Sequence, residues 1–253
     1  MNRSCSVPRH LMDNDLIGPS GKLKADPASP IKLPLIFAFW LWVTLSIPAY
    51  AAPSVSERYG NVYYSVENGI TRQITKSGNF GEPVLSPDGR TIAFIHIDGM
   101  ANSDGEGGFT SLWVADGQTG QTRKLLGPRE DQDPKLNLAS FQHPRFSLDG
   151  GYIYIDADAW ATSSAVHQIN IKTGVHRFVI DGWTMGVLRT GPFRGYLLVG
   201  RHRYHPAPAY GSFNPVYVVR PDGHETFMVP DSDKDDGERS LPAWLREKGW
   251  KAW

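Results

Sequence analysis

The sequence predicts an all-β fold built from antiparallel four-stranded units, and three observations lead to this prediction. Residues 52–230 contain short runs rich in Val, Ile, Tyr and Phe, separated by clusters of Gly, Asp, Asn and Pro, which is typical of many short strands. These runs repeat along the chain with the same turn residues in the same register. No long helical period interrupts them, so a short helix is expected only near the C-terminus.

Residues 1–51 are expected to be a leader and secretory signal peptide. An apolar run from Leu33 to Ile47 follows three lysines and precedes Ala49-Tyr50-Ala51, a small-x-small cleavage pattern. The run is shorter than the roughly 20 residues that cross a bilayer. We therefore expect cleavage after Ala51 and a periplasmic or secreted chain without a stable membrane span; the alternative is an inner-membrane signal-anchor.

The first repeated unit is a strand, a tight turn and a second strand. The segment from Pro83 to Phe94 is matched 61 residues later by the segment from Pro144 to Ile155, with Pro, Ser, Asp, Gly and Ile in register. In the first copy Pro87 presets φ at one corner of the turn, Asp88 tolerates the next corner, and Gly89 takes the positive φ of a bulged hairpin. Two equivalent hairpins are therefore predicted.

A second hairpin type recurs four times between these units. Each copy is a strand, a turn that contains Gly and another strand. Alternation of the two hairpin types gives four-stranded sheets, which are the blades of a propeller. The four copies start at Val62-Tyr63-Tyr64, Leu112-Trp113-Val114, Val166-His167-Gln168-Ile169 and Val216-Tyr217-Val218-Val219, and end at Arg72-Gln73-Ile74, Arg123-Lys124-Leu125, Arg177-Phe178-Val179 and Thr226-Phe227-Met228.

These repeats resemble those of TolB-type β-propellers over about residues 60–230. The resemblance rests on Ser86-Pro87-Asp88-Gly89 before an Ile-Ala-Phe strand, and on a following strand that ends in Asp116 before Thr119-Gly120. A second copy has Asp149-Gly150 and Thr173-Gly174, whereas the third, Gly191 to Leu198, lacks the Ser-Pro-Asp-Gly turn. The resemblance implies a binding platform, a periplasmic scaffold or the non-catalytic half of a peptidase, and does not assign an activity.

The chain is short for this resemblance, because TolB-type propellers usually have six or more blades. At roughly 40–50 residues per blade, residues 52–253 hold about four blades, and the first unit has only one recognisable hairpin. We therefore predict a small or incomplete β-propeller of about four blades. Either the ring is a small closed one of four blades, or it is open, or a second subunit completes it, in which case the chain forms a homo-oligomer.

Composition and missing motifs exclude several classes of function. The formal net charge is zero, so the chain lacks the basic surface that nucleic acid requires. The single cysteine, Cys5, precedes the cleavage site and leaves no thiol in the mature chain. Nucleophile-elbow, phosphate-loop and zinc-protease motifs are missing from the sequence. No catalytic residue, metal site or cofactor is assigned, and an enzyme is the less favoured interpretation.

The candidate ligand-binding residues lie on one Pro-rich loop. Arginines on this loop could hold carboxylate or phosphate, and tyrosine rings could stack on a ligand. The expected function is a non-catalytic binding or protein-interaction scaffold, with a protein partner or a small anionic or sugar ligand. The alternative is a small carbohydrate-active or hydrolytic enzyme that uses this loop at the propeller mouth. The residues are Arg201, His202, Arg203, Tyr204, His205 and Tyr210.

Residues 231–253 are expected to form an acidic linker and a Trp-rich tail. Ser240 can cap a short helix that Gly249 ends. Leu241, Trp244 and Leu245 fall on one face of this helix. The tail either docks on the propeller or recruits a partner.

Overall fold

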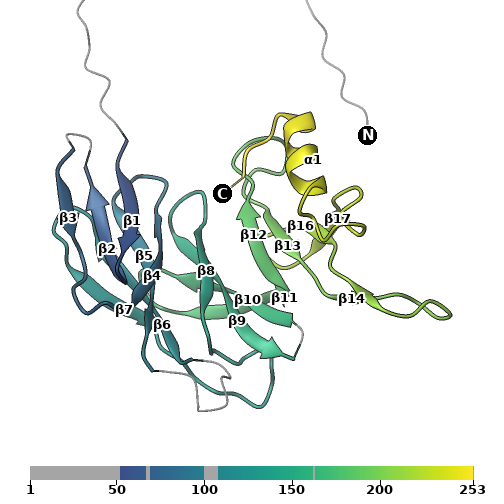
Figure 1. The fold of residues 1–253 in the computed structure, drawn as a ribbon, viewed down its shortest axis with the longest axis horizontal. Coiled ribbons are helices and arrows are strands. Elements are labelled where there is room, and N and C mark those ends of the chain that lie inside the picture. Colours follow the sequence, from purple (N-terminus) through teal and green to yellow (C-terminus); the bar gives the residue numbers. More distant parts are fainter. Residues whose placement is uncertain (1–51, 67–68, 100–107, 162, 253) are drawn as a thin grey trace, which may run out of the picture. The chain divides into compact units, whose positions relative to one another are not determined.

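The computed structural model describes residues 52–66, 69–99, 108–161 and 163–252. The predicted leader and its cleavage site lie outside these residues. The described strands form four successive sheets, each an antiparallel meander in chain order (Figure 1). A two-stranded hairpin projects from the fourth sheet, and one α-helix follows it.

The element bounds are as follows. The first sheet contains β1 (Ser54–Arg58), β2 (Asn61–Ser65) and β3 (Thr71–Gln73). The second contains β4 (Phe80–Leu85), β5 (Thr91–Ile97), β6 (Thr110–Asp116) and β7 (Thr122–Leu126). The third contains β8 (Gln142–Phe146), β9 (Tyr152–Trp160), β10 (Ser163–Asn170) and β11 (His176–Asp181). The fourth contains β12 (Trp183–Val187), β13 (Leu197–Gly200), β16 (Val216–Val219) and β17 (Glu225–Met228); the projecting hairpin is β14 (Arg203–Tyr204) with β15 (Ser212–Phe213), and the helix is α1 (Ser240–Lys248).

The predicted fold class is confirmed. Between Tyr63 and Val229 the described residues contain strands, bridges, turns and bends but no α-helix. Three sheets have four strands, and the first has three. Strand β1 was missed because Ser54–Arg58 is mostly polar and lacks the Val, Ile and Tyr content that marks the other strands.

The two predicted Asp-Gly turns are equivalent. In one turn the Ser86 hydroxyl donates to Asp88 Oδ1 at 2.6 Å; in the other the Ser147 hydroxyl donates to Asp149 Oδ1, also at 2.6 Å. The glycine that follows each aspartate has positive φ, 73° and 69°. Because both turns are held by local hydrogen bonds, their chemistry could be predicted from the sequence alone.

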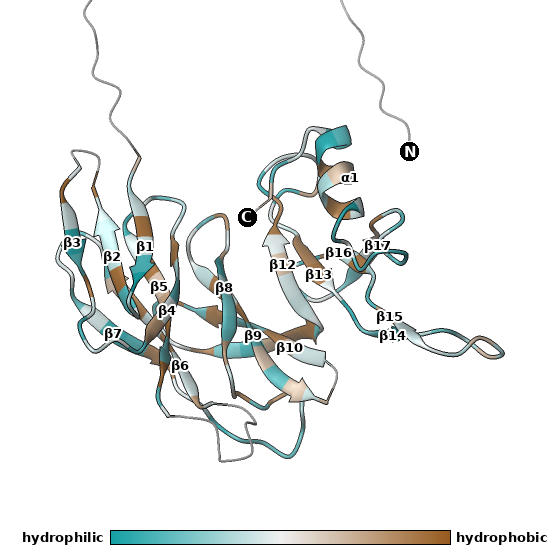
Figure 2. Cartoon of the chain, viewed as in Figure 1, coloured by the Kyte–Doolittle hydropathy of each residue, from teal (hydrophilic) through white to brown (hydrophobic). Residues whose placement is uncertain are grey.

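Each sheet packs one face against the next sheet. Figure 2 shows apolar residues concentrated along central strands such as β5 and β13. Alternating side chains of a strand point to opposite faces, so a sheet with neighbours on both sides is apolar on both. Buried clusters join the first sheet to the second through Val62, Tyr64, Ile92 and Phe94, the second to the third through Ile95, Leu112, Phe141, Ile153 and Ile155, and the third to the fourth through Val166, Ile180, Leu197 and Val199.

The helix α1 covers the far face of the fourth sheet. Leu241, Trp244 and Leu245 are buried there against a cluster that includes Leu198 and Val218. The predicted apolar face of the helix is thus confirmed, and so is its end at Gly249. A fifth sheet would have to pack on the face that α1 occupies. In a closed ring, the first sheet would have to pack on that same face.

The start of α1 differs from the prediction that Ser240 caps it. The N-cap is Arg239 and makes no side-chain cap hydrogen bond. Instead Asp235 Oδ2 accepts from the Ser240 N–H at 2.9 Å, and Asp235 Oδ1 accepts from the Ser240 hydroxyl at 2.7 Å. The acidic segment therefore supplies the acceptor for the helix start, and Ser232 within it is fully buried.

Arginines at one repeat position bridge consecutive sheets. The guanidinium groups of Arg72 and Arg123 donate to the carbonyl oxygens of Gln118 and Ile171 in the turn of the next sheet. Arg177 donates in the same way to the Pro221 carbonyl oxygen, at 2.6 Å. The matching residue of the fourth sheet is Thr226, which has no following sheet to reach. We call these three residues the arginine bridges.

Replacing Arg123 with Met should lower the free energy of unfolding by about 1 kcal/mol, because one charge-assisted hydrogen bond between sheets is lost at an exposed site. The measurement is the urea midpoint by circular dichroism. Lys172→Met is the matched control, since the Lys172 side chain is exposed and, within the described part of the chain, only the Lys172 backbone makes a hydrogen bond. Equal midpoints for the two variants would contradict the bridging role.

Among the described residues, no helix is both long and apolar enough to cross a bilayer.

Candidate functional site

The two ends of the sheets differ. At one end, short turns join most of the strands, as at residues 86–90, 147–151 and 170–175, and residues 188–196 form one longer connection. At the other end lie the longer connections, including residues 127–141 and 201–215. Loops that carry function are held by a rigid scaffold, so this second end, here called the loop end, is where a site is expected.

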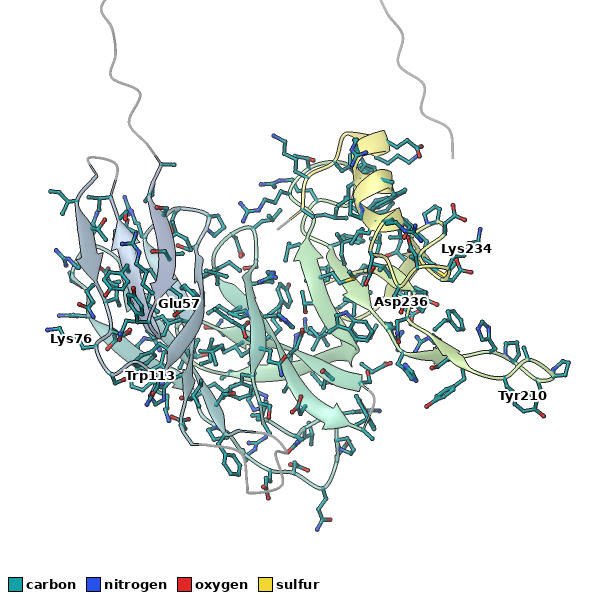
Figure 3. All side chains as sticks on the ribbon, in the orientation of Figure 1. Glu57, Lys76, Trp113, Tyr210, Lys234 and Asp236 are labelled. Carbon is teal, nitrogen blue, oxygen red and sulfur yellow. The ribbon has the colours of Figure 1, made fainter. Side chains whose placement is uncertain are left out.

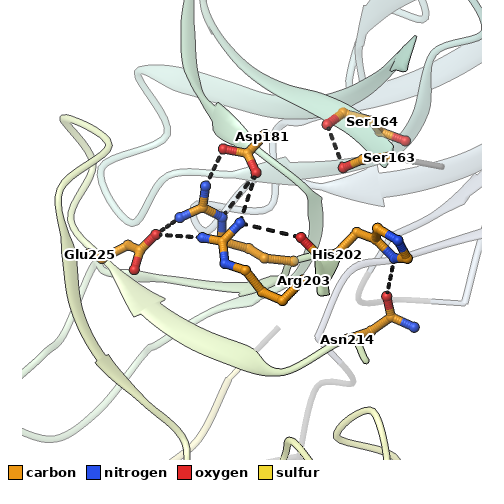
Figure 4. A network of polar contacts seen from close by, with 8 residues as sticks. Ser163, Ser164, Asp181, His202, Arg203, Asn214 and Glu225 are labelled. Carbon is orange, nitrogen blue, oxygen red and sulfur yellow. Dashed lines mark hydrogen bonds and ion pairs between the residues drawn. The ribbon is translucent and has the colours of Figure 1, made fainter. Parts of the chain in front are cut away.

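Arg201 and Arg203, both predicted to bind a ligand, form ion pairs within the protein. Figure 4 shows Arg203 with Asp181 and Glu225. Arg201 contacts the carboxylates of Asp181 and Glu225. Arg203 reaches the same two carboxylates at 3.3 Å and 2.9 Å. Both guanidinium groups also lie over the ring of Tyr217, at 5.9 Å and 5.5 Å. Two positive and two negative charges are therefore balanced. The network ties β11, β14 and β17 to Arg201, the residue that follows β13.

His202 belongs to the base of the projecting hairpin. Its Nδ1 lies 2.9 Å from Asn214 Oδ1. The Asn214 N–H and side-chain amide both donate to Asp236, at 2.9 Å and 3.2 Å. These contacts fix both strands at the point where the hairpin leaves the fourth sheet.

The remaining predicted residues follow the hairpin outward. Tyr204 is 70% exposed, and Tyr210 near the tip is 95% exposed; Figure 3 shows Tyr210 at the far end of the hairpin. His205 stacks on Phe213, with ring centroids 4.5 Å apart. The structure thus separates the predicted set into a fixed base, Arg201 to Arg203, and an exposed aromatic arm.

A polar network that was not predicted from the sequence joins strands β4, β8, β9 and β12. Glu82 and His143 both have positive φ, 50° and 52°, at matching bulges of β4 and β8. The His143 N–H donates to Glu82 Oε2 at 2.5 Å. His143 Nδ1 lies 3.0 Å from Asp156 Oδ2, and Asp156 accepts from the Thr184 N–H at 2.9 Å. A signal was present, because both bulged residues precede the repeated proline.

The charges of this network are set by burial and pairing. Burial of the Asp156 carboxyl raises its pKa, and hydrogen bonds from His143 and Thr184 oppose this shift. The hydrogen bond to Asp156 raises the pKa of His143, which burial partly counteracts. His143 therefore holds its proton to a higher pH than an isolated imidazole and compensates the buried carboxylate beside it.

A cavity of about 330 Å³ opens beside this network. The indole of Trp183 forms part of its wall and lies against Gly200, where an added Cβ would be 2.4 Å from the ring. Trp160, 36% exposed, lines the cavity from the end of β9. The lining residues are Gln142, His143, Asp156, Asp158, Trp160, Ala161, Ser163, Ser164 and Trp183.

The succession of antiparallel meanders, each packed against the next, defines a protein of the β-propeller class. No family model matches the chain, and no curated protein matches it. The chain is similar to the propeller domain of the Trilobed protease from Pyrococcus furiosus, at 17% identity and a TM-score of 0.43, over 66% of this chain and 48% of that one.

Two further solved structures are similar. TolB from Acinetobacter baumannii has 12% identity and a TM-score of 0.43, over 69% of this chain and 40% of that one. Dipeptidyl peptidase 4 from Porphyromonas gingivalis has 10% identity and a TM-score of 0.49, over 69% of this chain and 30% of that one. The chain thus matches less than half of each of these proteins.

Proposed function

We propose that the chain is an exported, non-catalytic scaffold of the bacterial envelope that binds a protein partner through the β14–β15 hairpin. The observation that carries this proposal is the pair of exposed tyrosines, Tyr204 and Tyr210, on a hairpin that projects from the fourth sheet. Tyrosine offers a large contact area with only two side-chain torsions to order, and is enriched in binding hot spots.

The base of the hairpin supports this role. Arg201 and Arg203 with their two carboxylates, and His202 with Asn214, hold both strands in place before any partner arrives. Binding by a segment whose base is already ordered loses less conformational entropy than binding by a free loop. In this proposal the two arginines position the arm, and the tyrosines contact the partner.

Site-specific photo-crosslinking tests the proposal. A photoreactive phenylalanine analogue at Tyr204 or Tyr210 should join the chain to one recurrent protein in cells that naturally produce it. The control places the same analogue at Tyr59, which is also 95% exposed but lies in the β1–β2 turn. Adducts of equal yield at all three positions, or none at Tyr204 and Tyr210, would contradict the proposal. Export is tested separately, because the mature chain should begin at Ala52.

A further inference from the structure

We infer that the cavity beside His143 binds a protonated amine. The cavity lies at the loop end between the third and fourth sheets, and is separate from the hairpin that the proposed function uses. Either proposal can therefore fail while the other stands. The inference rests on three properties of the cavity wall: its charge, its aromatic surface and its hydrogen-bond acceptors.

The wall has a net negative character. Three ionisable residues line it, namely His143, Asp156 and Asp158. His143 and Asp156 are paired with each other at 3.0 Å and largely compensate. Among the described residues, the exposed carboxylate of Asp158 forms no ion pair or side-chain hydrogen bond, and no Lys or Arg lines the cavity. The uncompensated carboxylate favours a cationic ligand over a neutral one and disfavours an anionic one.

Two indoles provide the aromatic surface. Tryptophan is the side chain whose ring face attracts cations most strongly. Trp183 is held in place because its ring rests on the backbone of Gly200, which has no Cβ to displace it. Trp160 is partly exposed on the same cavity. An ammonium group near these rings and Asp158 gains both a cation–π contact and an ion pair.

The remaining wall supplies acceptors. An ammonium group donates three hydrogen bonds and accepts none. Gln142, Ser163 and Ser164 also line the cavity, and their side chains carry a carbonyl and two hydroxyl oxygens that can accept hydrogen bonds. These groups can also form hydrogen bonds with hydroxyl groups elsewhere on the ligand. The cavity volume of about 330 Å³ falls in the range of small-molecule sites.

Three sugars of similar size test the charge preference in the full chain. Glucosamine, glucose and glucuronate share a pyranose ring and carry a positive, a neutral and a negative group. Calorimetric titration should give a glucosamine Kd lower than that of glucose by about tenfold, and no measurable binding of glucuronate. Glucuronate binding as tight as glucosamine binding would overturn the inference.

Two variants connect this preference to the cavity. Asp158→Asn should weaken glucosamine binding by about tenfold and leave glucose binding unchanged, because shape is kept and charge is removed. Glu247→Gln on α1 is the matched control, since Glu247 is exposed and is not one of the residues that line the cavity. Gly200→Ala should displace the Trp183 indole and abolish binding of both sugars. If that variant does not fold, Trp183→Leu tests the same ring.

The amine could belong to a free small molecule or to a lysine side chain of a protein. Acetyl-Gly-Lys-Gly-amide, compared with the same peptide carrying norleucine, distinguishes these sources. Binding of the lysine peptide without glucosamine binding assigns the cavity to a protein ligand and still supports the inference. If neither glucosamine nor the lysine peptide binds at millimolar concentration, to the native chain or to its variants, the inference is overturned.

Discussion

Replacing Trp244 with Ala should lower the free energy of unfolding of the fourth sheet by about 3–5 kcal/mol, the usual cost of removing a buried large aromatic side chain. Trp244 is only 6% exposed. Its ring contacts those of Phe227 and Trp250 edge-on, with centroids 6.1 Å and 5.1 Å apart. The variant loses these contacts and exposes the face of β16 and β17 that α1 covers.

Hydrogen exchange measures this effect, because it reports on individual sheets. Protection of the β16 amides should fall in Trp244→Ala, and that of the β9 amides should not. Trp160→Ala is the control, since Trp160 is 36% exposed and belongs to the third sheet. Unchanged β16 protection would mean that the tail is not needed for stability, and would favour its use as a recruiting peptide.

Acidification should destabilise the third sheet between pH 6.5 and about 4, because His167 is buried in its neutral form. Among the described residues, neither ring nitrogen of His167 has a hydrogen-bond partner. Burial, with smaller contributions from His176 and Arg129, lowers its pKa from 6.5 to about 4. Burial also lowers the pKa of His176, whose ring centroid lies 5.8 Å from that of His167.

The sign follows from proton binding. Above pH 6.5 His167 is neutral in both the folded and the unfolded chain, so it makes no pH-dependent contribution to the free energy of unfolding. Below 6.5 the unfolded chain binds a proton that the folded chain does not, until the folded pKa of about 4 is reached. The cost grows across this window to about 3 kcal/mol, at about 1.4 kcal/mol per pKa unit.

Urea unfolding at several pH values tests this dependence. His167→Phe removes the titrating group and should lose less stability than the native chain as the pH falls from 7 to 4. His224→Phe is the matched control, because His224 is exposed. Parallel stability curves for the native chain and His167→Phe would show that this histidine is not the cause.

The features that were predicted correctly are held by contacts within a few residues. The turns at Asp88 and Asp149 are closed by their own Ser and Gly neighbours, so a short stretch of sequence is enough to specify them. The apolar face of α1 follows from a helical period in the same way. Both are local properties, and both were recognisable in the sequence.

The features that were missed depend on partners far apart in the sequence. Arg201 and Asp181 are 20 residues apart, and Thr184 and Asp156 are 28 apart. Nothing near Arg201 in the chain shows that its charge is already compensated. The bulges at Glu82 and His143 each arise where one extra residue interrupts the strand ladder. Strand pairing, which the sequence leaves undefined, decides where this happens.

The arginine bridges imply that heat or urea will dismantle this protein stepwise. Every bridge joins one sheet to its immediate successor, and the apolar clusters join the same neighbours. In such one-dimensional assemblies cooperativity extends only as far as the coupling between adjacent units. A single melting temperature would then describe the least protected unit, and the fraction of protein able to bind a ligand would decline sheet by sheet.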